Sequence, residues 1–448
     1  MNLHRMLLER QEQGDMIRIG LIGAGKFGTM FVSQALRTPG MHLAAIADLN
    51  PERARQSMIS TGWPDEKIDA GTMDEALLKD KTFITDSSEE LINCDGMDII
   101  IEATGIPTVG IRHALSSIRE GKHVIMVNVE GDALAGPLIA KRAKEAGVIY
   151  SLAYGDQPAL IAEQVDWARA CGLEVVAAGK GTKYLPEYHY STPDTVWNYY
   201  GLSPEEARAG GMNSKMFNSF LDGTKSAIEM AAVANATGLL PPSDGLKFPP
   251  CGVSDLAHIL KPIKSGGTLE QKGMVEVISS LNRDGSNIQG DLRWGVFVSF
   301  EAPTDYVKRC FSEYGLVTDE TGRYSALYRP YHLIGLELGI SVASIALRKE
   351  PTGCASGFRG DVVSIAKKDL YPGEILDGEG GYTVWGKLYP ARDSLSKGLL
   401  PLGLAQGIRV VREVPKGAPL TWNDVAFSPS DDGVKIRKEI EKAFSDDL

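Results

Sequence analysis

Short apolar runs alternate with helix-like segments through the first third of the chain. The runs are Ile17 to Ile22, Leu43 to Ala47, Met97 to Ile101, Val124 to Val127 and Val148 to Tyr150. Apolar runs of this length are typical of parallel strands that are buried on both faces, and the segments between them carry helical periodicity. We therefore predict an α/β domain with a doubly wound parallel sheet over residues 16–158.

The pattern changes after residue 158. Apolar or alternating segments are separated here by longer stretches of chain. They are Leu173 to Ala178, Gly273 to Ile278, Gly290 to Phe300 and Tyr324 to Tyr331. They predict an antiparallel sheet in an α+β domain, residues 159–331, which we expect to bind substrate and to join subunits. A long apolar segment from His332 to Leu347 predicts a helix, within residues 332–352, that returns to the first domain.

The remaining segments are smaller. Residues 1–15 predict a short amphipathic helix at the N-terminus, and residues 431–448 form a charged tail with a helix near its middle. Between them, residues 353–430 combine short apolar runs with Pro-Gly turns, which predicts a small, mostly-β module.

Composition narrows the class of protein. The chain has 448 residues, of which 43% are hydrophobic and 23% charged, as in globular proteins with several domains. Its net charge of −11 argues against a nucleic-acid partner. No apolar run approaches the roughly 20 residues that span a bilayer, no signal peptide is evident, and the five cysteines are scattered. We expect a cytoplasmic protein that acts on a small molecule, without a membrane partner.

A glycine motif follows the first apolar run. Gly23, Gly25 and Gly28 form G-x-G-x-x-G between a strand and a helix, and Asp48 ends the second strand 20 residues after Gly28. The first glycine allows a tight turn, the second lets a pyrophosphate approach the backbone, and the third lets the helix pack closely. The stretch therefore predicts a Rossmann dinucleotide site; the alternative is a glycine turn used only for packing.

The choice of cofactor is open at this level. Asp48 favours NAD, because a carboxylate accepts hydrogen bonds from a free ribose, whereas Arg53 lies where it would contact the 2′-phosphate of NADP. Thr104 and Gly105 follow the third strand and are expected near the nicotinamide. The cofactor-binding residues that we predict are Gly23, Gly25, Lys26, Phe27, Gly28, Asp48, Arg53, Thr104, Gly105 and Asn128.

Two segments of the second domain carry candidate chemistry. Lys180, Lys183 and His189 lie in a glycine-rich and aromatic stretch after a strand, which suits an anionic group of the substrate; the alternative is a solvated loop. Read as one helix from 213 to 238, the chain places Asn218, Asp222, Lys225 and Glu229 on one face. This polar stripe predicts an active-site wall, the alternative being an ordinary surface helix with ion pairs.

These features resemble a known family. The Rossmann start, the strand end Glu102-Ala-Thr-Gly105 and the Gly121-Lys-His-Val segment look like the homoserine dehydrogenase-type superfamily, and residues 361–428 look like a SAF domain. The order of the three parts resembles the 1-deoxy-D-xylulose 5-phosphate reductoisomerase-like family. One departure stands out: the catalytic lysine that follows an asparagine in homoserine dehydrogenases is absent, because Asn128 is followed by Val129.

The resemblance implies a reaction and roles. It implies an NADPH-dependent reductoisomerase that makes 2-C-methyl-D-erythritol 4-phosphate for isoprenoid synthesis by the methylerythritol phosphate pathway. It also implies a divalent cation, Mg²⁺ or Mn²⁺, for which the sequence shows no clear ligand cluster. Lys225 would move protons beside Asp222, and Glu130 would orient a diol or bind the cation. Lys180, Lys183, His189 and Asn218 would bind the phosphorylated substrate of a homodimer or homotetramer.

Two other functions fit the same residues. The first is an NAD(P)-dependent dehydrogenase or oxidoisomerase of another hydroxy acid or sugar acid, in which the lysines at 180 and 183 would bind a carboxylate. The second is a non-catalytic NADP sensor whose C-terminal module binds a partner or a carbohydrate.

Overall fold

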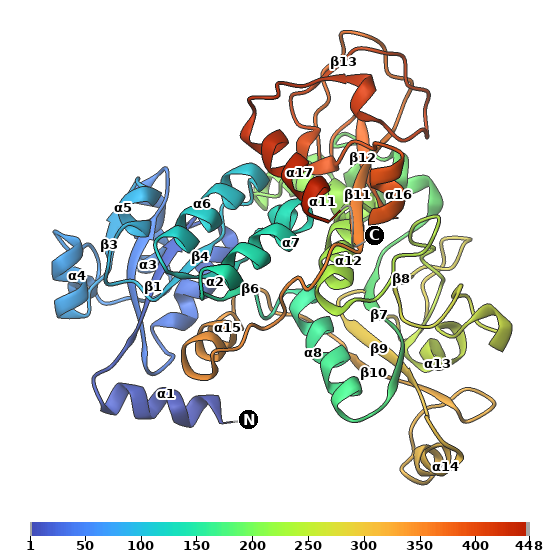
Figure 1. The fold of residues 1–448 in the computed structure, drawn as a ribbon, viewed down its shortest axis with the longest axis horizontal. Coiled ribbons are helices and arrows are strands. Elements are labelled where there is room, and N and C mark those ends of the chain that lie inside the picture. The colour runs from blue at the N-terminus through green and yellow to red at the C-terminus, as the bar shows by residue number, and fades with distance from the viewer. Residues whose placement is uncertain (1, 445–448) are drawn as a thin grey trace. The chain divides into compact units, whose positions relative to one another are not determined.

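The structure is a computed structural model that describes residues 2–444 (Figure 1). Its chain divides into two compact units. The first holds the residues up to Leu160 together with Leu333–Ala355, and the second holds Ile161–His332 and the residues from Ser356 onward. Helix α8 (Gln157–Ala170) carries the chain from the first unit into the second.

The first unit is built on a six-stranded sheet in the order β3-β2-β1-β4-β5-β6, and every pair of neighbours is parallel. Its strands are β1 (Ile17–Ile22), β2 (Met41–Ala47), β3 (Phe83–Thr85), β4 (Ile99–Glu102), β5 (His123–Met126) and β6 (Tyr150–Leu152). The order reverses between β1 and β4, and the carboxyl ends of strands at such a switch point form the ligand crevice of doubly wound folds. The predicted α/β fold class is confirmed.

Helices cover both faces of this sheet (Figure 1). Ile19 and Leu21 of β1 pack with Phe31 of α2 and Met58 of α3, whereas Ile22 faces the side where Leu91 of α5 packs. The alternation follows from the period of two along a strand. The helices of this unit are α1 (Leu3–Glu12), α2 (Lys26–Ala35), α3 (Pro51–Ser60), α4 (Met73–Lys79), α5 (Ser88–Ile92), α6 (Pro107–Arg119), α7 (Val129–Glu145) and α15 (Gly339–Ala343).

Two details of this unit differ from the expectation. The short strand β3 is absent from the predicted apolar runs. The helix expected from His332 begins only at Gly339 and continues as a π-helical turn, Ser344–Arg348, because residues before it form turns around Gly335.

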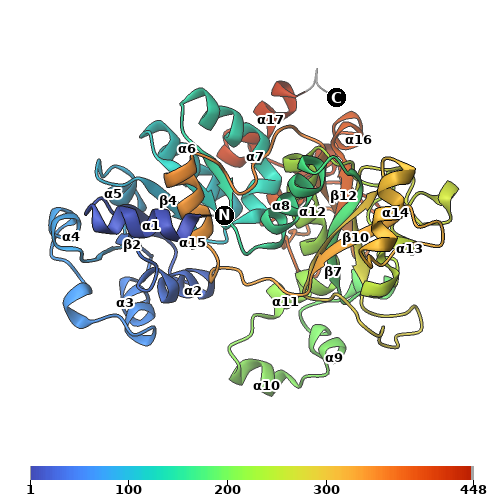
Figure 2. The same ribbon diagram turned by 90° about the horizontal axis from the view of Figure 1, so that it is seen from below.

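The second unit is built on a four-stranded sheet in the order β10-β9-β7-β8. Its strands are β7 (Glu174–Thr182), β8 (Met274–Ser279), β9 (Val296–Glu301) and β10 (Tyr324–Arg329). The sheet was expected to be antiparallel but is mixed, because β7 runs parallel to β8 and antiparallel to β9. The helices around it are α9 (Val196–Tyr200), α10 (Pro204–Ala209), α11 (Ser214–Leu221), α12 (Thr224–Thr237), α13 (Leu256–Ile259) and α14 (Asp305–Glu313). Figure 2 shows α9 and α10 on the same side of this unit.

The single helix predicted over residues 213–238 is two helices. Helix α11 ends at Leu221 and α12 begins at Thr224, and Gly223 between them has a φ of 88°. Glycine adopts this left-handed conformation without strain, so it ends one helix and starts another. The i,i+4 face drawn through residue 222 is therefore wrong, because the break changes the direction in which the earlier residues point.

The C-terminal residues pack on α12 within the same unit. They form two small antiparallel pairs, β11 (Gly360–Ala366) with β12 (Val384–Pro390) and β13 (Arg409–Val410) with β14 (Val425–Ala426), and the helices α16 (Ala391–Ser396) and α17 (Asp432–Ala443). A fully buried ion pair ties α17 to β11: Arg437 donates to both carboxylate oxygens of Asp361, at 2.9 and 2.6 Å.

Within the described residues, no helix is long and apolar enough to cross a membrane.

Candidate active site

The glycine turn between β1 and α2 has the geometry expected of a dinucleotide site. Gly23 has a φ of 102°, and a Cβ there would lie 2.6 Å from the carbonyl oxygen of Ala103. A Cβ on Gly28 would lie 2.2 Å from the carbonyl oxygen of Gly23. A Cβ on Gly25 would meet nothing within 4 Å, so the space above the helix N-terminus is open to a ligand.

The two residues between these glycines differ in their surroundings. Lys26, the first residue of α2, is exposed, which is consistent with contact to a cofactor phosphate. Phe27 packs against the core of the first unit. Phe27 therefore supports the turn by packing.

Asp48 and Arg53 form a closed pair at the end of β2. Arg53 donates to both oxygens of the buried Asp48 carboxylate, with its Nη2 at 2.7 Å from each, and the backbone of Ala24 and Asn50 donates to the same oxygens. Burial works to raise the pKa of Asp48, but these hydrogen bonds outweigh it and hold the pKa below its ordinary value. The carboxylate is thus engaged by the protein, and the half-exposed Arg53 adds positive charge beside it.

Glu102 ends β4 with its side chain fully buried. Its Oε1 accepts from the Thr104 hydroxyl at 2.5 Å and from the Thr104 amide at 3.2 Å, and the Nδ1 atom of His113 on α6 lies 3.4 Å away. Gly105, just beyond, is exposed with a φ of 71°. Thr104 therefore orders the strand end, while Gly105 leaves an open backbone there.

Asn128 caps α7 at the end of β5. Its Oδ1 accepts from the amide of Gly131 at 3.1 Å, while its Nδ2 and Oε2 of Glu102 are buried and have no hydrogen-bond partner among the described residues. Both atoms border Gly110, where a Cβ would lie 2.6 Å from Nδ2 and 2.7 Å from Oε2. Glu130 lies half-buried in the first turn of α7. Sequence reasoning missed His113 and Gly110 because neither stands in a motif.

In the second unit, the structure gives Asp222 a partner that the sequence did not indicate, Lys367. Asp222 is fully buried, and its partner is Lys367, whose Nζ lies 2.7 Å from its Oδ2. Lys367 also donates to the carbonyl oxygens of Ser191 and Gly381, at 2.7 and 2.8 Å. This pair therefore joins the break between α11 and α12 to the end of β11. Lys225 is half-buried in the first turn of α12.

Two residues that we predicted to bind substrate bind other residues of the protein instead. Lys180 lies inside β7, not in a loop, and forms a buried ion pair with Glu229 of α12. Asn218 is fully buried, donates to the carbonyl oxygens of Ser191 and Gly380, and accepts from the Ser191 hydroxyl. Both side chains hold the fold together, because their polar atoms are satisfied within it.

Lys183 lies in a different setting, among aromatic rings. Its Nζ donates to the carbonyl oxygen of Tyr199 and lies 5.6 Å from the ring centroid of Tyr200. Arg293 contacts the same ring, with its Cζ 5.7 Å from the centroid. Burial lowers the pKa of Lys183, and the charge of Arg293 lowers it further. Two cations thus share one ring, and the arginine was not foreseen.

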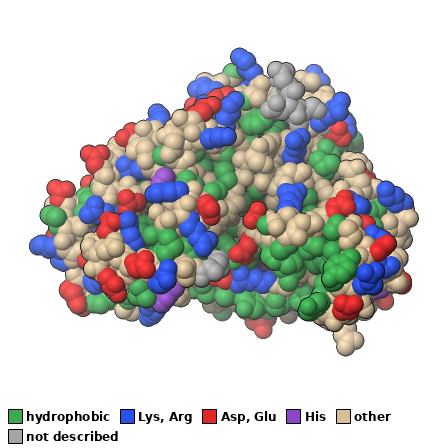
Figure 3. All heavy atoms as spheres, turned by 60° about the horizontal axis from the view of Figure 1, so that its bottom comes forward, with side chains coloured by type: hydrophobic (Ala, Val, Ile, Leu, Met, Phe, Trp, Pro, Cys, Tyr) green, Lys and Arg blue, Asp and Glu red, His purple; other side chains and the backbone are tan. Residues whose placement is uncertain are grey.

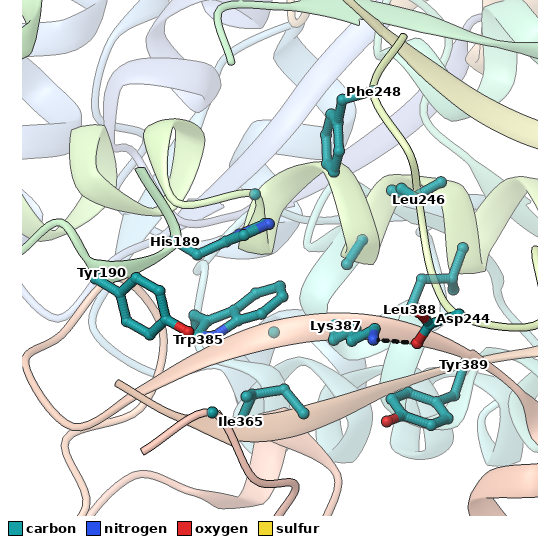
Figure 4. Close-up of a pocket in the computed structure, with 14 residues that line it drawn as sticks. His189, Tyr190, Asp244, Leu246, Phe248, Ile365, Trp385, Lys387, Leu388 and Tyr389 are labelled. Atoms are coloured by element: carbon teal, nitrogen blue, oxygen red, sulfur yellow. Dashed lines mark hydrogen bonds and ion pairs between the residues drawn. The ribbon is translucent and has the colours of Figure 1, made fainter. Parts of the chain in front are cut away.

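His189 is half-buried between partners that keep it neutral. Its Nδ1 lies 2.7 Å from the carbonyl oxygen of Asp222, so it carries the proton, and its Nε2 accepts from the Tyr184 hydroxyl at 2.9 Å. Burial lowers its pKa to about 4. The ring stacks on Trp385 with centroids 3.9 Å apart, at the wall of a cavity in this unit (Figure 4). A neutral imidazole is unsuited to bind a phosphate as a cation.

Among the described residues, no group of three or more His, Cys, Asp or Glu side chains is arranged to hold a metal ion. The Mg²⁺ or Mn²⁺ suggested by the resemblance therefore has no support in this site.

Comparison with known families agrees with this division. Residues 17–126 match the model of an oxidoreductase family with an NAD-binding Rossmann fold. This segment is therefore similar to the NAD-binding domain of an oxidoreductase. More particularly, residues 155–338 match the model of the catalytic domain of oxidoreductase DRL, which makes that segment similar to a catalytic domain.

Solved structures match over part of the chain. An NAD-binding oxidoreductase from Klebsiella pneumoniae is 21% identical over 39% of this chain and 44% of its own, with a TM-score of 0.28. The myo-inositol dehydrogenase of Lactobacillus casei is 12% identical over 40% and 50%, with a TM-score of 0.29, and the WlbA dehydrogenase of Bordetella pertussis is 19% identical over 39% and 50%, with a TM-score of 0.27. The chain spans about half the length of these structures. No curated protein matched it.

These matches correct the family resemblance. The models that fit are those of a Rossmann oxidoreductase family and of oxidoreductase DRL, so the assignment to the 1-deoxy-D-xylulose 5-phosphate reductoisomerase-like family is wrong. The isoprenoid pathway and the homoserine dehydrogenase likeness, which followed from it, are withdrawn. Neither model covers residues 353–430, so the SAF assignment is withdrawn as well.

Proposed function

We propose that this protein is an NADP(H)-dependent dehydrogenase that interconverts a secondary alcohol and a carbonyl group in a small hydroxy acid or sugar acid. The observation that carries the proposal is the pair of cations, Lys183 and Arg293, on the Tyr200 ring. It lies in the region that matches a catalytic domain model. Neither cation forms an ion pair with a carboxylate among the described residues, in a unit where Lys180, Lys261 and Lys367 each do.

An anion is the ligand that this pair favours. Two like charges close together in a partly buried site repel, and the lowered pKa of Lys183 reflects that repulsion together with its burial. A carboxylate or phosphate would relieve the repulsion and form charge-assisted hydrogen bonds with both groups.

The cofactor preference rests on Arg53. Because Arg53 and two backbone amides already engage Asp48, the carboxylate is poorly placed to take both ribose hydroxyls of NAD. The guanidinium, half-exposed at the end of β2, is suited to a 2′-phosphate. We therefore assign NADP(H) in preference to NAD(H), with the open backbone at Gly25 for the pyrophosphate.

Bound nicotinamide would supply the hydride acceptor for alcohol oxidation and the hydride donor for the reverse reaction. The protein must then take a proton from the hydroxyl as the carbonyl forms, and return it in the reverse direction. Lys225, in the first turn of α12, is our candidate for this proton transfer. Glu130 and Thr104 follow strand ends of the first unit and are assigned to positioning the cofactor.

A homo-oligomer remains part of the proposal. β10 is an edge strand of its sheet, and exposed apolar side chains on and around it include Leu327, Tyr328, Tyr331 and Trp294. Figure 3 shows hydrophobic side chains gathered on one face of the molecule. Contiguous apolar surface at a sheet edge favours association with a second copy, and sedimentation of the purified protein would measure it.

The test is a substrate screen followed by a matched pair of variants. Hydroxy acids, sugar acids, sugar phosphates and the corresponding neutral sugars are offered with NADP⁺ and with NAD⁺, and reduction is followed by absorbance. We expect turnover of carboxylated substrates with NADP⁺. Turnover of neutral sugars at equal efficiency would contradict the anionic substrate, and exclusive use of sugar phosphates would replace the acid with a phosphate.

Two variants test whether the anionic group of the substrate binds at Arg293. Arg293→Ala should raise KM for the acid by about tenfold to a hundredfold, because a hydrogen bond to a charged group contributes about 1.5 to 3 kcal/mol. Arg309→Ala is the matched control, since Arg309 also lies over a tyrosine, Tyr306, at 5.6 Å, but is exposed elsewhere in the unit. Equal KM values for the two variants would remove Arg293 from the substrate site.

A further inference from the structure

A cavity of about 290 Å³ lies within the second unit, apart from the Lys183 and Arg293 pair (Figure 4). Its walls come from the segment around His189, from the start of α12, from the loop 244–248 and from β12. Small-molecule pockets usually measure about 300 to 1,000 Å³, so this one is of a size for a single ring. The proposed dehydrogenase reaction does not use it.

The cavity offers aromatic faces to an occupant. Trp385 stacks on His189 with an interplanar angle of 18°, and Phe248, Tyr190 and Tyr389 complete the ring-bearing walls. Figure 4 shows these rings arranged around the opening, with Leu246 and Ile365 between them. Such faces bind a ligand with an apolar face of C–H groups or an aromatic ring.

The polar groups of the cavity balance in charge. Lys387 donates to Asp244 at 2.7 Å, which brings one cation and one anion to the same wall. His189 is neutral, because its Nδ1 proton is held by the Asp222 carbonyl and its Nε2 accepts from Tyr184. Lys416 contacts the Tyr190 ring but does not line the cavity. A neutral ligand with both donors and acceptors therefore fits better than an acid.

One donor in the wall lacks an acceptor. The Nε1–H of Trp385, a residue that is 9% exposed, has no hydrogen-bond partner among the described residues. Buried indole N–H groups usually find an acceptor, because leaving one unpaired costs about 1 to 3 kcal/mol. In Figure 4 the Tyr190 hydroxyl lies beside this ring. A ligand hydroxyl at this corner would accept from the indole and donate to the phenol.

The walls are also held in place before any ligand arrives. Phe248 has a φ of 50°, an uncommon conformation for a bulky residue, and its ring stacks on Tyr184 with centroids 3.9 Å apart. The buried carboxylate of Glu276 accepts from the amides of Lys247 and Phe248 and so fixes this strained turn. Strain that is maintained in this way is concentrated at ligand sites.

We propose that this cavity binds a neutral, hydroxylated six-membered ring of the monosaccharide class. The aromatic faces would stack on its C–H face, the indole and phenol would bind one hydroxyl, and the Lys387–Asp244 pair would bind another. Sugar rings combine these two features, an apolar face and a hydroxylated edge. The site goes beyond the proposed dehydrogenase activity and requires neither cofactor nor substrate.

The test is ligand-observed saturation-transfer NMR on the full chain without cofactor. The probes are methyl β-D-glucopyranoside, methyl β-D-galactopyranoside and methyl α-D-mannopyranoside, set against glucuronate and adenosine. We expect saturation transfer to at least one neutral glycoside, strongest at its C–H face. Binding of adenosine or glucuronate alone, or of no probe at all, would overturn the proposal.

Variants of residues inside and outside the cavity show whether the saturation transfer arises from binding there. Trp385→Phe keeps a ring but removes the indole donor, and should weaken glycoside binding by about threefold to tenfold, the range of one hydrogen bond. Trp167→Phe, on α8 and outside the cavity, is the matched control and should change nothing. If Trp385→Phe fails to fold, Ala227→Leu fills the cavity from α12 and should abolish binding. Unchanged binding in the folded variant would overturn the assignment.

Discussion

Two buried aspartates show how differently the two units build their polar sites. Asp48 in the first unit is neutralised by Arg53, five residues further along the chain, and by backbone amides of the same βαβ segment. Asp222 in the second unit is neutralised by Lys367, which lies far away in the sequence at the end of β11. The first site is a local motif, whereas the second exists only when distant segments have packed together.

The difference has consequences for stability. Arg53 is half-exposed, so water can solvate Asp48 when the arginine is lost. Lys367 is 2% exposed at its side chain and Asp222 is 0% exposed, so removing the lysine leaves an unpaired buried charge. The first unit should therefore tolerate changes to its charges, and the second unit should not.

The sharpest way to test this contrast is Lys367→Met. We expect it to lower the free energy of unfolding by about 3 to 5 kcal/mol, the usual cost of removing one partner of a buried ion pair. Lys368→Met is the matched control: Lys368 is exposed and pairs with Glu374 at the surface, so its loss should cost less than about 1 kcal/mol. Urea unfolding measures both. If both variants lose the same free energy of unfolding, the buried Asp222–Lys367 pair contributes no more than a surface pair.

Two glycines of the first unit should have different roles, one in stability and the other in cofactor binding. Gly28→Ala should cost about 3 kcal/mol, because its Cβ would lie 2.2 Å from a backbone oxygen that cannot move aside. Gly25→Ala has open space for its Cβ and should leave the thermal midpoint unchanged, while it weakens NADP⁺ binding about tenfold by intruding on the pyrophosphate. Melting curves and cofactor titrations distinguish the two. A strongly destabilised Gly25→Ala would contradict the open approach.

His189 should make the free energy of unfolding of the second unit depend on pH. Its folded pKa of about 4 lies below the unfolded value of about 6.5, so the unfolded chain binds the extra proton first as the pH falls. Stability from this group is complete above about pH 6.5 and is lost down to about pH 4, with roughly 2 kcal/mol lost between pH 7.5 and 5. Comparing urea unfolding of His189→Gln with the native protein at both values isolates it. A native slope that persists in the variant would assign the dependence to other groups.

The smallest expected effect is on cofactor choice. Arg53→Ala should weaken NADP⁺ binding by about tenfold, roughly 1.4 kcal/mol, and leave NAD⁺ binding nearly unchanged or improved, because Asp48 becomes free to accept from a ribose. The ratio of the two dissociation constants is the measurement. If both cofactors weaken alike, Arg53 serves the fold and not the choice of cofactor.

The first unit was largely readable from the chain. The glycine spacing, the apolar runs and Asp48 all lie within one βαβ segment, where period and turn chemistry determine the backbone directly. Even there, Glu102 and His113 were paired only by the packing of α6 on the strand end. Strand β3 was missed because its three residues are too few to display a period.

The second unit was readable only in part. Its four strands were foreseen, but most of its helices and the partners of Lys180, Asn218 and Asp222 were not. These three side chains lie in the interior of the fold. A polar residue on an apolar helix looks the same in the sequence whether it faces a substrate or a buried partner. Arg293 escaped notice because nothing near it in the chain indicates the Tyr200 ring.

The sequence by itself determined the parallel sheet and the dinucleotide turn, because both depend on residues within a few tens of positions and on backbone geometry. Only the tertiary structure decided which charges are free. Within residues 2–444, Lys183 and Arg293 have no carboxylate partner while Lys180 and Lys367 have one, and that outcome depends on contacts between segments far apart in the chain. Burying an unpaired charge costs free energy, so most buried charges in the folded chain have a partner. The charges that lack one are the candidates to bind ligands.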